Sequence, residues 1–211
     1  MITFKQFLDE ALEHQAGSET TQVATTTGTY QKTAEKIKGL MPTGGAVLDY
    51  GAGLGEGTRA MAEILKDRAV VHGYEPSPGR AKQKPNFTDP EDIKGQYDAV
   101  VSHNVLNVLE PELRHQVTKH ILGLIKPEGH AIIGTRKWTG DVNAAKNAEP
   151  ADEEKAIWIT KKTKSGPQKV YQKGFDKNEL QDYIKGLAGE DFEVKRLSGI
   201  AANAVQVKRL K

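Results

Sequence analysis

The glycine-rich stretch at residues 46–57, A-V-L-D-Y-G-A-G-L-G-E-G, constrains the fold more than any other part of the chain. The apolar run at 46–48 predicts a short buried strand, and residues 58–66, T-R-A-M-A-E-I-L-K, predict a helix. Glycine adopts positive φ angles at low cost and has no side chain to keep a ligand away from the backbone. A strand, a glycine turn and a helix in this order are typical of an α/β sheet that binds a nucleotide-like ligand at the carboxyl end of its first strand.

The glycine spacing differs from that of a dinucleotide-binding turn. Such a turn has glycines at relative positions one, three and six, so that a pyrophosphate reaches the helix N-terminus. Counted from Gly51, the sixth position is Glu56, whose carboxylate would repel a pyrophosphate. Asp49 precedes the first glycine, and Glu75 ends the next predicted strand at 69–74, where an acid can accept hydrogen bonds from ribose hydroxyls. Glu75 therefore predicts a ligand that contains adenosine, but dinucleotide-binding enzymes have the same feature, so it does not identify the cofactor.

These motifs resemble those of class I S-adenosylmethionine-dependent methyltransferases. The resemblance rests on D-x-G-x-G-x-G with Glu75, on A-V-V-S-H-N-V-L-N-V-L at 99–109 and on L-I-K-P-E-G-H-A-I-I-G at 124–134. It implies S-adenosylmethionine as the cofactor. It also implies an α/β, Rossmann-like fold with a seven-stranded or slightly reduced, mostly parallel sheet, a C-terminal antiparallel strand and helices on both faces.

The resemblance also implies roles for individual residues. His103 and Asn104 are the expected catalytic residues, with His103 as a general base for an oxygen or nitrogen acceptor, because an unperturbed histidine titrates near working pH. An enzyme that relies on proximity alone would need no base. The expected cofactor-binding residues are Asp49, Gly51, Ala52, Gly53, Gly55, Glu75, Pro76, Ser102 and Tyr30. The expected substrate-binding residues are Asn107, Arg136 and Trp138.

The segment that follows Glu75 is shorter than this family implies. Residues 76–93 contain four prolines and little apolar pattern, which predicts that the helix of the third βα unit is lost or reduced to a turn. Residues 86–88 are the expected remnant of the third strand. Asp89 and Asp92 are the candidates to reach the adenine amino group.

Length and composition predict one α/β domain with an N-terminal extension. We expect a helix and flexible linker at 1–28, with Thr3 as N-cap, and a methyltransferase domain at 29–211 whose substrate-side loop and hairpin occupy 139–175. The opening residues also look like those of many tailed-phage proteins, which hints at a viral origin. A chain without a long apolar window or a secretory signal is expected to be cytoplasmic, in the host if viral, with no membrane partner.

Cysteine and metal chemistry are not expected. The chain has no cysteine, which excludes disulfides, thiolate metal sites and a cysteine nucleophile. Methyltransferases that attack C5 of cytosine use such a cysteine and are therefore excluded. His115 and His120, on a helix predicted at 110–125, are interpreted as surface residues rather than metal ligands.

The later part of the chain predicts a polar, mobile lid at 141–154 and a hairpin at 155–175 that carries lysines and aromatic residues. Those lysines could follow a phosphate backbone or could protect an exposed sheet edge. The last predicted elements are a helix at 176–187 and closing strands at 192–197 and 204–208. Asp176 is the expected N-cap of this helix, and Glu179 would complete a capping box.

The acceptor stays open between a small molecule, a protein and a nucleic acid, as does the oligomeric state. A non-catalytic accessory protein of the same fold is one alternative function. An NAD(P)-dependent oxidoreductase is another, and Glu56 opposes it.

Overall fold

The central sheet has six strands in the order β2-β1-β3-β4-β9-β8. The computed structural model describes residues 3–6, 8–9, 27–79, 81, 83–163, 166–176 and 178–211. Its elements are α3 (Thr27–Leu40), β1 (Gly45–Tyr50), α4 (Glu56–Leu65), β2 (Ala69–Tyr74), η1 (Pro90–Asp92), β3 (Tyr97–His103), η2 (Leu106–Val108), α5 (Pro111–Gly123), β4 (Ile125–Thr135), η3 (Val142–Ala144), β5 (Ala148–Pro150), β6 (Ala156–Thr163), β7 (Gly166–Lys173), α6 (Glu179–Ala188), β8 (Phe192–Arg196) and β9 (Asn203–Arg209). Strands β2, β1, β3 and β4 are parallel, and β9 is antiparallel between β4 and β8.

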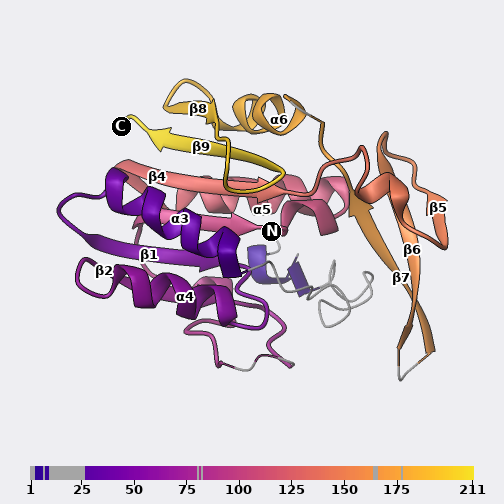
Figure 1. Ribbon diagram of the computed structural model, residues 1–211, viewed down its shortest axis with the longest axis horizontal. Coiled ribbons are helices and arrows are strands. Elements are labelled where there is room, and N and C mark those ends of the chain that lie inside the picture. The colour runs from indigo at the N-terminus through magenta and orange to yellow at the C-terminus, as the bar shows by residue number, and fades with distance from the viewer. Residues whose placement is uncertain are drawn as a thin grey trace.

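Helices cover both faces of this sheet (Figure 1). Alternate residues of each strand point to opposite faces, so the sheet supplies two hydrophobic cores. The first core lies under α3 and α4 and includes Val47, Val101 and Ile132. The second core lies under α5 and α6 and includes Leu48 and Ile133. The predicted Rossmann-like class is therefore confirmed.

The third strand of the expected seven is reduced to a single bridge. Phe87 pairs with Tyr74 in parallel, at the outer edge of β2. The side chain of Asn86 accepts a hydrogen bond from the Gly73 amide at 2.8 Å. Residues 86–88 are thus the remnant that the sequence predicted, and η1 is all the helix that the described part of this segment forms.

The described part of the N-terminal segment packs on the core beside this shortened unit. Residues 4–6 and 8–9 are helical. The Gln6 amide donates to the Thr3 hydroxyl and the Thr3 amide to the Gln6 side chain, which confirms Thr3 as the N-cap. Phe4 and Leu8 join the core under α5, and Lys5 pairs with Asp89. The predicted contacts of Phe7, Ala11 and Leu12 and most of the predicted linker lie outside the described residues, whereas 27–29 already belong to α3.

His120 is not the surface residue that the sequence suggested. Its ring lies 4.5 Å from that of Phe4, and its Nδ1 is 2.9 Å from the Tyr50 hydroxyl. The helical periodicity of 110–125 did not reveal this burial, because the covering residue comes from the other end of the chain. Burial lowers the pKa of His120 to about 4.

A second, three-stranded sheet extends beyond the carboxyl end of the main strands (Figure 1). The predicted hairpin is formed by β6 and β7, with Trp158 opposite Tyr171. The segment predicted as a mobile polar lid contains η3 and a third strand, β5, which pairs with β6. Backbone pairing with a neighbouring strand orders this polar stretch, which has no apolar pattern of its own. Asp176 is not the N-cap that the sequence predicted, because α6 begins at Glu179 and its N-cap residue is Asn178. Of the predicted capping box, the Asp176 amide donates to the Glu179 side chain at 2.9 Å.

Among the described residues, no helix is both long and apolar enough to cross a membrane.

The half-buried His120 predicts that acid destabilises the protein. The unfolded chain takes up this proton near pH 6.5 and the folded protein only near pH 4, so stability is lost as pH falls through this interval. His120→Phe should lose less stability than the wild type between pH 7 and pH 4.5, by up to about 3 kcal/mol. Urea unfolding at several pH values measures the difference, with His115→Gln on the same helix as control. Parallel curves for the wild type and His120→Phe would contradict the assignment.

Candidate functional site

The loop between β1 and α4 adopts the backbone that only glycine takes easily. Gly51, Gly53 and Gly55 have φ angles of 84°, 55° and 82°. A Cβ atom on Gly51 would lie 2.3 Å from Cγ2 of Val105, so the loops after β1 and β3 meet at this glycine. The amides of Gly51 and Ala52 both donate to the Tyr74 carbonyl at 2.9 Å, which joins the loop to the end of β2.

Asp49 is fully buried at the end of β1 and is held by two neutral hydroxyls. Thr58 donates to one carboxylate oxygen at 2.6 Å, and Tyr30 donates to the other at 3.3 Å. Tyr30 reaches this position because Gly57 has no side chain: a Cβ there would lie 2.2 Å from the tyrosine ring. Burial outweighs the two hydrogen bonds and raises the pKa of Asp49 to about 7. A cationic group placed beside Asp49 would stabilise its ionised form.

Glu75 connects the glycine loop to the segment that follows β2. It is 5% exposed, and its two oxygens accept hydrogen bonds from the Gly53 amide at 2.8 Å and the Ser77 amide at 3.2 Å. Pro76 follows it and is half-buried. Two acids therefore flank the glycine loop, one beneath it and one at its outer end.

The end of β3 carries three of the residues expected at the site. Ser102 is 1% exposed, and its hydroxyl has no hydrogen-bond partner among the described residues. His103 is 4% exposed, lies 2.8 Å from the Thr33 hydroxyl through Nε2, and has a pKa lowered by burial to about 4. Asn104 has a φ angle of 60°, which is uncommon for a residue other than glycine, and its amide donates to the Gly134 carbonyl. Such backbone strain is frequent at functional sites.

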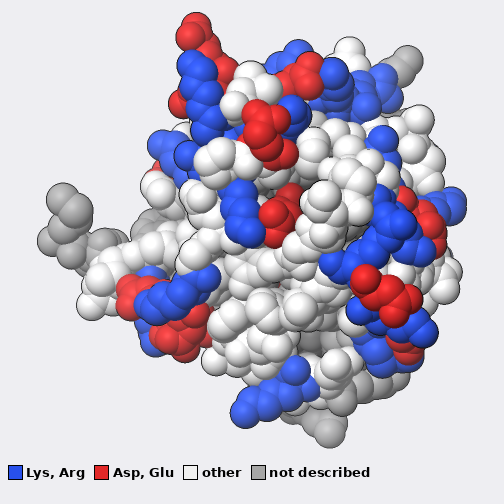
Figure 2. All heavy atoms as spheres, turned by 90° about the vertical axis from the view of Figure 1, so that its left-hand side faces the viewer, with Lys and Arg blue, Asp and Glu red and all other residues white. Residues whose placement is uncertain are grey.

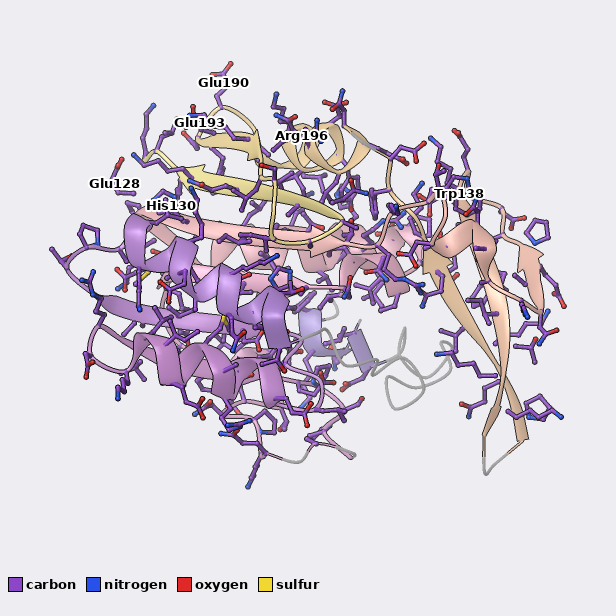
Figure 3. The ribbon with its side chains drawn as sticks, in the orientation of Figure 1. Glu128, His130, Trp138, Glu190, Glu193 and Arg196 are labelled. Atoms are coloured by element: carbon purple, nitrogen blue, oxygen red, sulfur yellow. The ribbon has the colours of Figure 1, made fainter. Side chains whose placement is uncertain are left out.

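The three residues predicted to bind the substrate lie near the joint between the two sheets. Asn107 and Arg136 both donate to Oε1 of Gln172, at 3.4 and 3.1 Å, and Arg136 also pairs with Asp141. Trp138 lies beyond the carboxyl end of β4, at the base of the second sheet (Figure 3), where its amide donates to the Phe175 carbonyl. Asn107 and Arg136 are therefore brought together, whereas the Trp138 backbone packs closely against Gly174.

Three residues of this region were not among the candidates predicted from the sequence. Gln172, Thr33 and Thr58 stand in ordinary strand or helix positions, and only the folded chain reveals their partners. A threonine in the first turn after the glycine loop could have suggested Thr58 as a donor to Asp49. Gln172 and Thr33 lie 65 and 70 residues from Asn107 and His103, the residues they meet.

The two candidates for an adenine contact differ in their surroundings. Asp89 already accepts hydrogen bonds from Lys5 and the Glu91 amide, whereas Asp92 is exposed. In the part of the chain that the structure describes, no group of three potential metal ligands is found.

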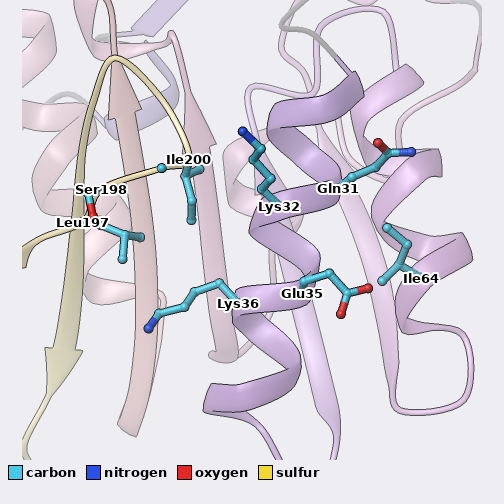
Figure 4. A pocket seen from close by; sticks show the side chains of 9 residues that line it. Gln31, Lys32, Glu35, Lys36, Ile64, Leu197, Ser198 and Ile200 are labelled. Atoms are coloured by element: carbon cyan, nitrogen blue, oxygen red, sulfur yellow. The ribbon is translucent and has the colours of Figure 1, made fainter.

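One hollow among the described residues borders the glycine loop, with Ala52, Gly53, Gly55 and Thr58 in its wall, and another lies on the outer side of α3. A cavity of about 430 Å³ lies between α4, β2 and residues 83–86, where the shortened third unit leaves space. A more open groove of about 710 Å³ lies between α3 and residues 197–200, with Lys32 and Lys36 on one side and Leu197 and Ile200 on the other (Figure 4). Neither is lined by Asp49 or Glu75.

A protein-family model described as a methyltransferase domain matches residues 26–163, which is more than half of the chain. The match includes the glycine loop, both acids and the end of β3. The chain belongs to the class I S-adenosylmethionine-dependent methyltransferases. S-adenosylmethionine is the cofactor of this family, and the predicted resemblance is confirmed.

Solved structures agree with this fold. A protein from Pyrococcus horikoshii gives a TM-score of 0.63 at 17% identity, over 99% of this chain and 100% of that one. An amino pentose methyltransferase from Micromonospora echinaspora gives 0.59 at 15% identity, over 99% and 98%. A sugar N-methyltransferase from a Streptoalloteichus species gives 0.61 at 13% identity, over 87% of each chain. A search by sequence among curated proteins finds no significant match. None of these comparisons supports a viral origin for the methyltransferase.

The buried Asp49 predicts that this methyltransferase loses stability as pH rises. The carboxyl ionises near pH 4 in the unfolded chain and only near pH 7 in the folded protein. The loss of folding stability therefore grows between these pH values and is complete above them. Asp49→Asn should therefore be more stable than the wild type at pH 8, by up to about 4 kcal/mol, and less so at pH 5. Urea unfolding at the two pH values measures this.

Asp98→Asn is the control, and it should change stability at pH 8 in the opposite direction. Lys126 and the Ala46 amide hold the pKa of Asp98 below its usual range, so its replacement should lower stability at pH 8. Equal stability of the wild type and Asp49→Asn at pH 8 would contradict the buried, ionisable Asp49.

Proposed function

We propose that this methyltransferase transfers the methyl group of S-adenosylmethionine to an oxygen or nitrogen atom of a small-molecule acceptor. The observation that supports it most is Asp49, a fully buried carboxyl with only hydroxyl donors, beside a glycine loop that ends at Glu75. A ligand with an ammonium group at one end and ribose hydroxyls in the middle meets both acids. Membership of the family also opposes the oxidoreductase alternative.

The cofactor roles follow from this geometry. Asp49 orients the amino group of the methionine end, directly or through water, and Gly51, Ala52, Gly53 and Gly55 let that end approach the backbone. Glu75 accepts hydrogen bonds from the ribose hydroxyls, next to Pro76. Tyr30 closes the site from α3, and Ser102 offers an unpartnered hydroxyl at the end of β3.

The chemical step needs little from the protein beyond alignment. S-adenosylmethionine supplies a methyl group on a sulfonium, which is an activated leaving group. The chain therefore contributes mainly by holding the acceptor in line with that methyl group. We assign this orienting role to Asn104, whose strained backbone follows β3 directly, and to Asn107 and Arg136 on the substrate side.

The surroundings of His103 argue against a general base. Its Nε2 is already engaged by Thr33, its Nδ1 is buried beside Gly134, and a pKa of about 4 makes it a weak base at neutral pH. These observations favour a mechanism in which the protein positions the acceptor next to the methyl group and uses no general base.

A small-molecule acceptor is favoured over a nucleic acid. The structural neighbours include an amino pentose methyltransferase and a sugar N-methyltransferase. Three hairpin lysines that could have followed a phosphate backbone are ion-paired: Lys155 with Asp176, Lys169 with Glu149 and Lys173 with Glu179. Figure 2 shows the opposite end of the molecule, away from this hairpin, where basic and acidic side chains are interspersed.

Calorimetric titration with S-adenosylhomocysteine tests the cofactor site. We expect micromolar binding, about −8 kcal/mol. Gly51→Ala should abolish it, because its Cβ would lie 2.3 Å from Val105. Gly95→Ala is the matched control, since Gly95 has a similar φ angle of 81° but no atom within 4 Å of such a Cβ. No binding by the folded wild type would reject the proposal and favour the accessory-protein alternative.

Binding at Asp49 predicts proton release. An ammonium group beside the carboxylate lowers its pKa from about 7, so S-adenosylhomocysteine should bind more tightly as pH rises from 6 to 8. Titrations at pH 6.5 in two buffers of different ionisation enthalpy measure the protons released. An affinity that is constant over this range would argue that Asp49 does not contact the ligand.

A further inference from the structure

His103 and α3 are connected by a hydrogen bond whose direction can be assigned. The Thr33 hydroxyl donates to the Thr29 carbonyl at 2.9 Å, which uses its one proton. The contact of 2.8 Å between Thr33 and Nε2 of His103 therefore requires that the imidazole donates. His103 is neutral in this arrangement, with its proton on Nε2.

The other side of the imidazole is closely packed. A Cβ atom on Gly134 would lie 2.4 Å from Nδ1 of His103, and Nδ1 has no hydrogen-bond partner among the described residues. A second proton on the ring would therefore point at β4 without an acceptor. This packing holds the ring in one orientation, with Nε2 directed at α3.

His103 also contacts the residue that binds Asp49. Tyr30 and Thr33 lie three residues apart on α3 and share one face of the helix. The rings of Tyr30 and His103 are 5.2 Å apart and meet edge to face. The same tyrosine lies over Gly57 and donates its hydroxyl to Asp49. One imidazole thus touches both α3 residues that define how the helix sits over the glycine loop.

We infer that His103 is a positioning residue, which acts through Thr33 to hold the first turns of α3 over the glycine loop so that Tyr30 keeps its hydroxyl on Asp49. The inference rests on the proposed cofactor site. It assigns to His103 and Thr33 an effect on cofactor affinity without contact to the cofactor. It also gives a reason for a neutral histidine at the end of β3: a charged ring would carry a second proton on the buried Nδ1, which has no partner among the described residues.

Substitution of Thr33 tests this role, and the chain offers a matched control. Thr33 and Thr118 are both fully buried helical threonines, and each donates to the carbonyl four residues earlier, at 2.9 and 2.8 Å. Thr118 lies on α5, across the sheet from α3. Thr33→Val should weaken S-adenosylhomocysteine binding about five- to tenfold, the loss expected for one hydrogen bond. Thr118→Val should bind with wild-type affinity, and Thr33→Ser should restore it.

A double-mutant cycle with His103→Phe separates this link from general packing. The phenyl ring keeps the edge-to-face contact with Tyr30 and lacks the Nε2 proton. In that background Thr33→Val should cause no further loss of affinity. Additive losses, or a Thr33→Val variant that binds like Thr118→Val, would overturn the inference.

Hydrogen exchange in the ligand-free protein tests the same link without the cofactor. Amides at 31–36 should exchange faster in Thr33→Val than in the wild type and Thr118→Val. Unchanged exchange there overturns the inference. Absence of S-adenosylhomocysteine binding by the wild type rejects the proposed function instead, and the exchange comparison still decides whether His103 and Thr33 hold α3.

Discussion

The carboxyl group of Asp49 is the constraint on which the rest of the site depends. A buried acid without hydrogen bonds would be strongly unfavourable, so the fold must bring donors to the end of β1. The donors come from Tyr30 on α3 and Thr58 on α4, one helix on each side of the glycine loop. The missing side chain at Gly57 lets the tyrosine approach. The glycines therefore have two roles: they allow the backbone turn, and Gly57 lets Tyr30 reach Asp49.

A shortened third βα unit is compatible with this arrangement because the end of β2 is secured in other ways. Phe87 bridges Tyr74, and the Gly73 amide donates to Asn86, so the strand that carries Glu75 keeps a neighbour on its outer side. The N-terminal segment packs Phe4 and Leu8 on the adjacent core and pairs Lys5 with Asp89. The reduced unit changes the edge of the sheet and leaves the glycine loop intact.

Features that depend on residues close in sequence were predictable, and features that depend on distant residues were not. The glycine turn, the strand that ends at Glu75 and the hairpin at β6 and β7 each follow from a local pattern. The burial of His120 depends on Phe4, and the partner of Asn107 is a glutamine on β7. Burial likewise lowers the pKa of His103, and its hydrogen-bond partner Thr33 lies 70 residues away. A local motif specifies which residue types stand at the site, but their protonation and orientation are set by packing across the chain.

The joint between the two sheets, where we propose that the acceptor binds, is held by ion pairs and hydrogen bonds. Two buried cations hold the second sheet against the main body: Arg114 pairs with Glu153, and Lys173 pairs with Glu179. Breaking either pair would leave a charge without its partner in a poorly hydrated place, which is strongly destabilising. Gln172, next to Lys173 on β7, accepts hydrogen bonds from both Asn107 and Arg136. If Asn107 and Arg136 orient the acceptor, as we propose, these side chains are already ordered before it binds, and a substrate whose polar groups match them spares the protein the entropy of ordering them.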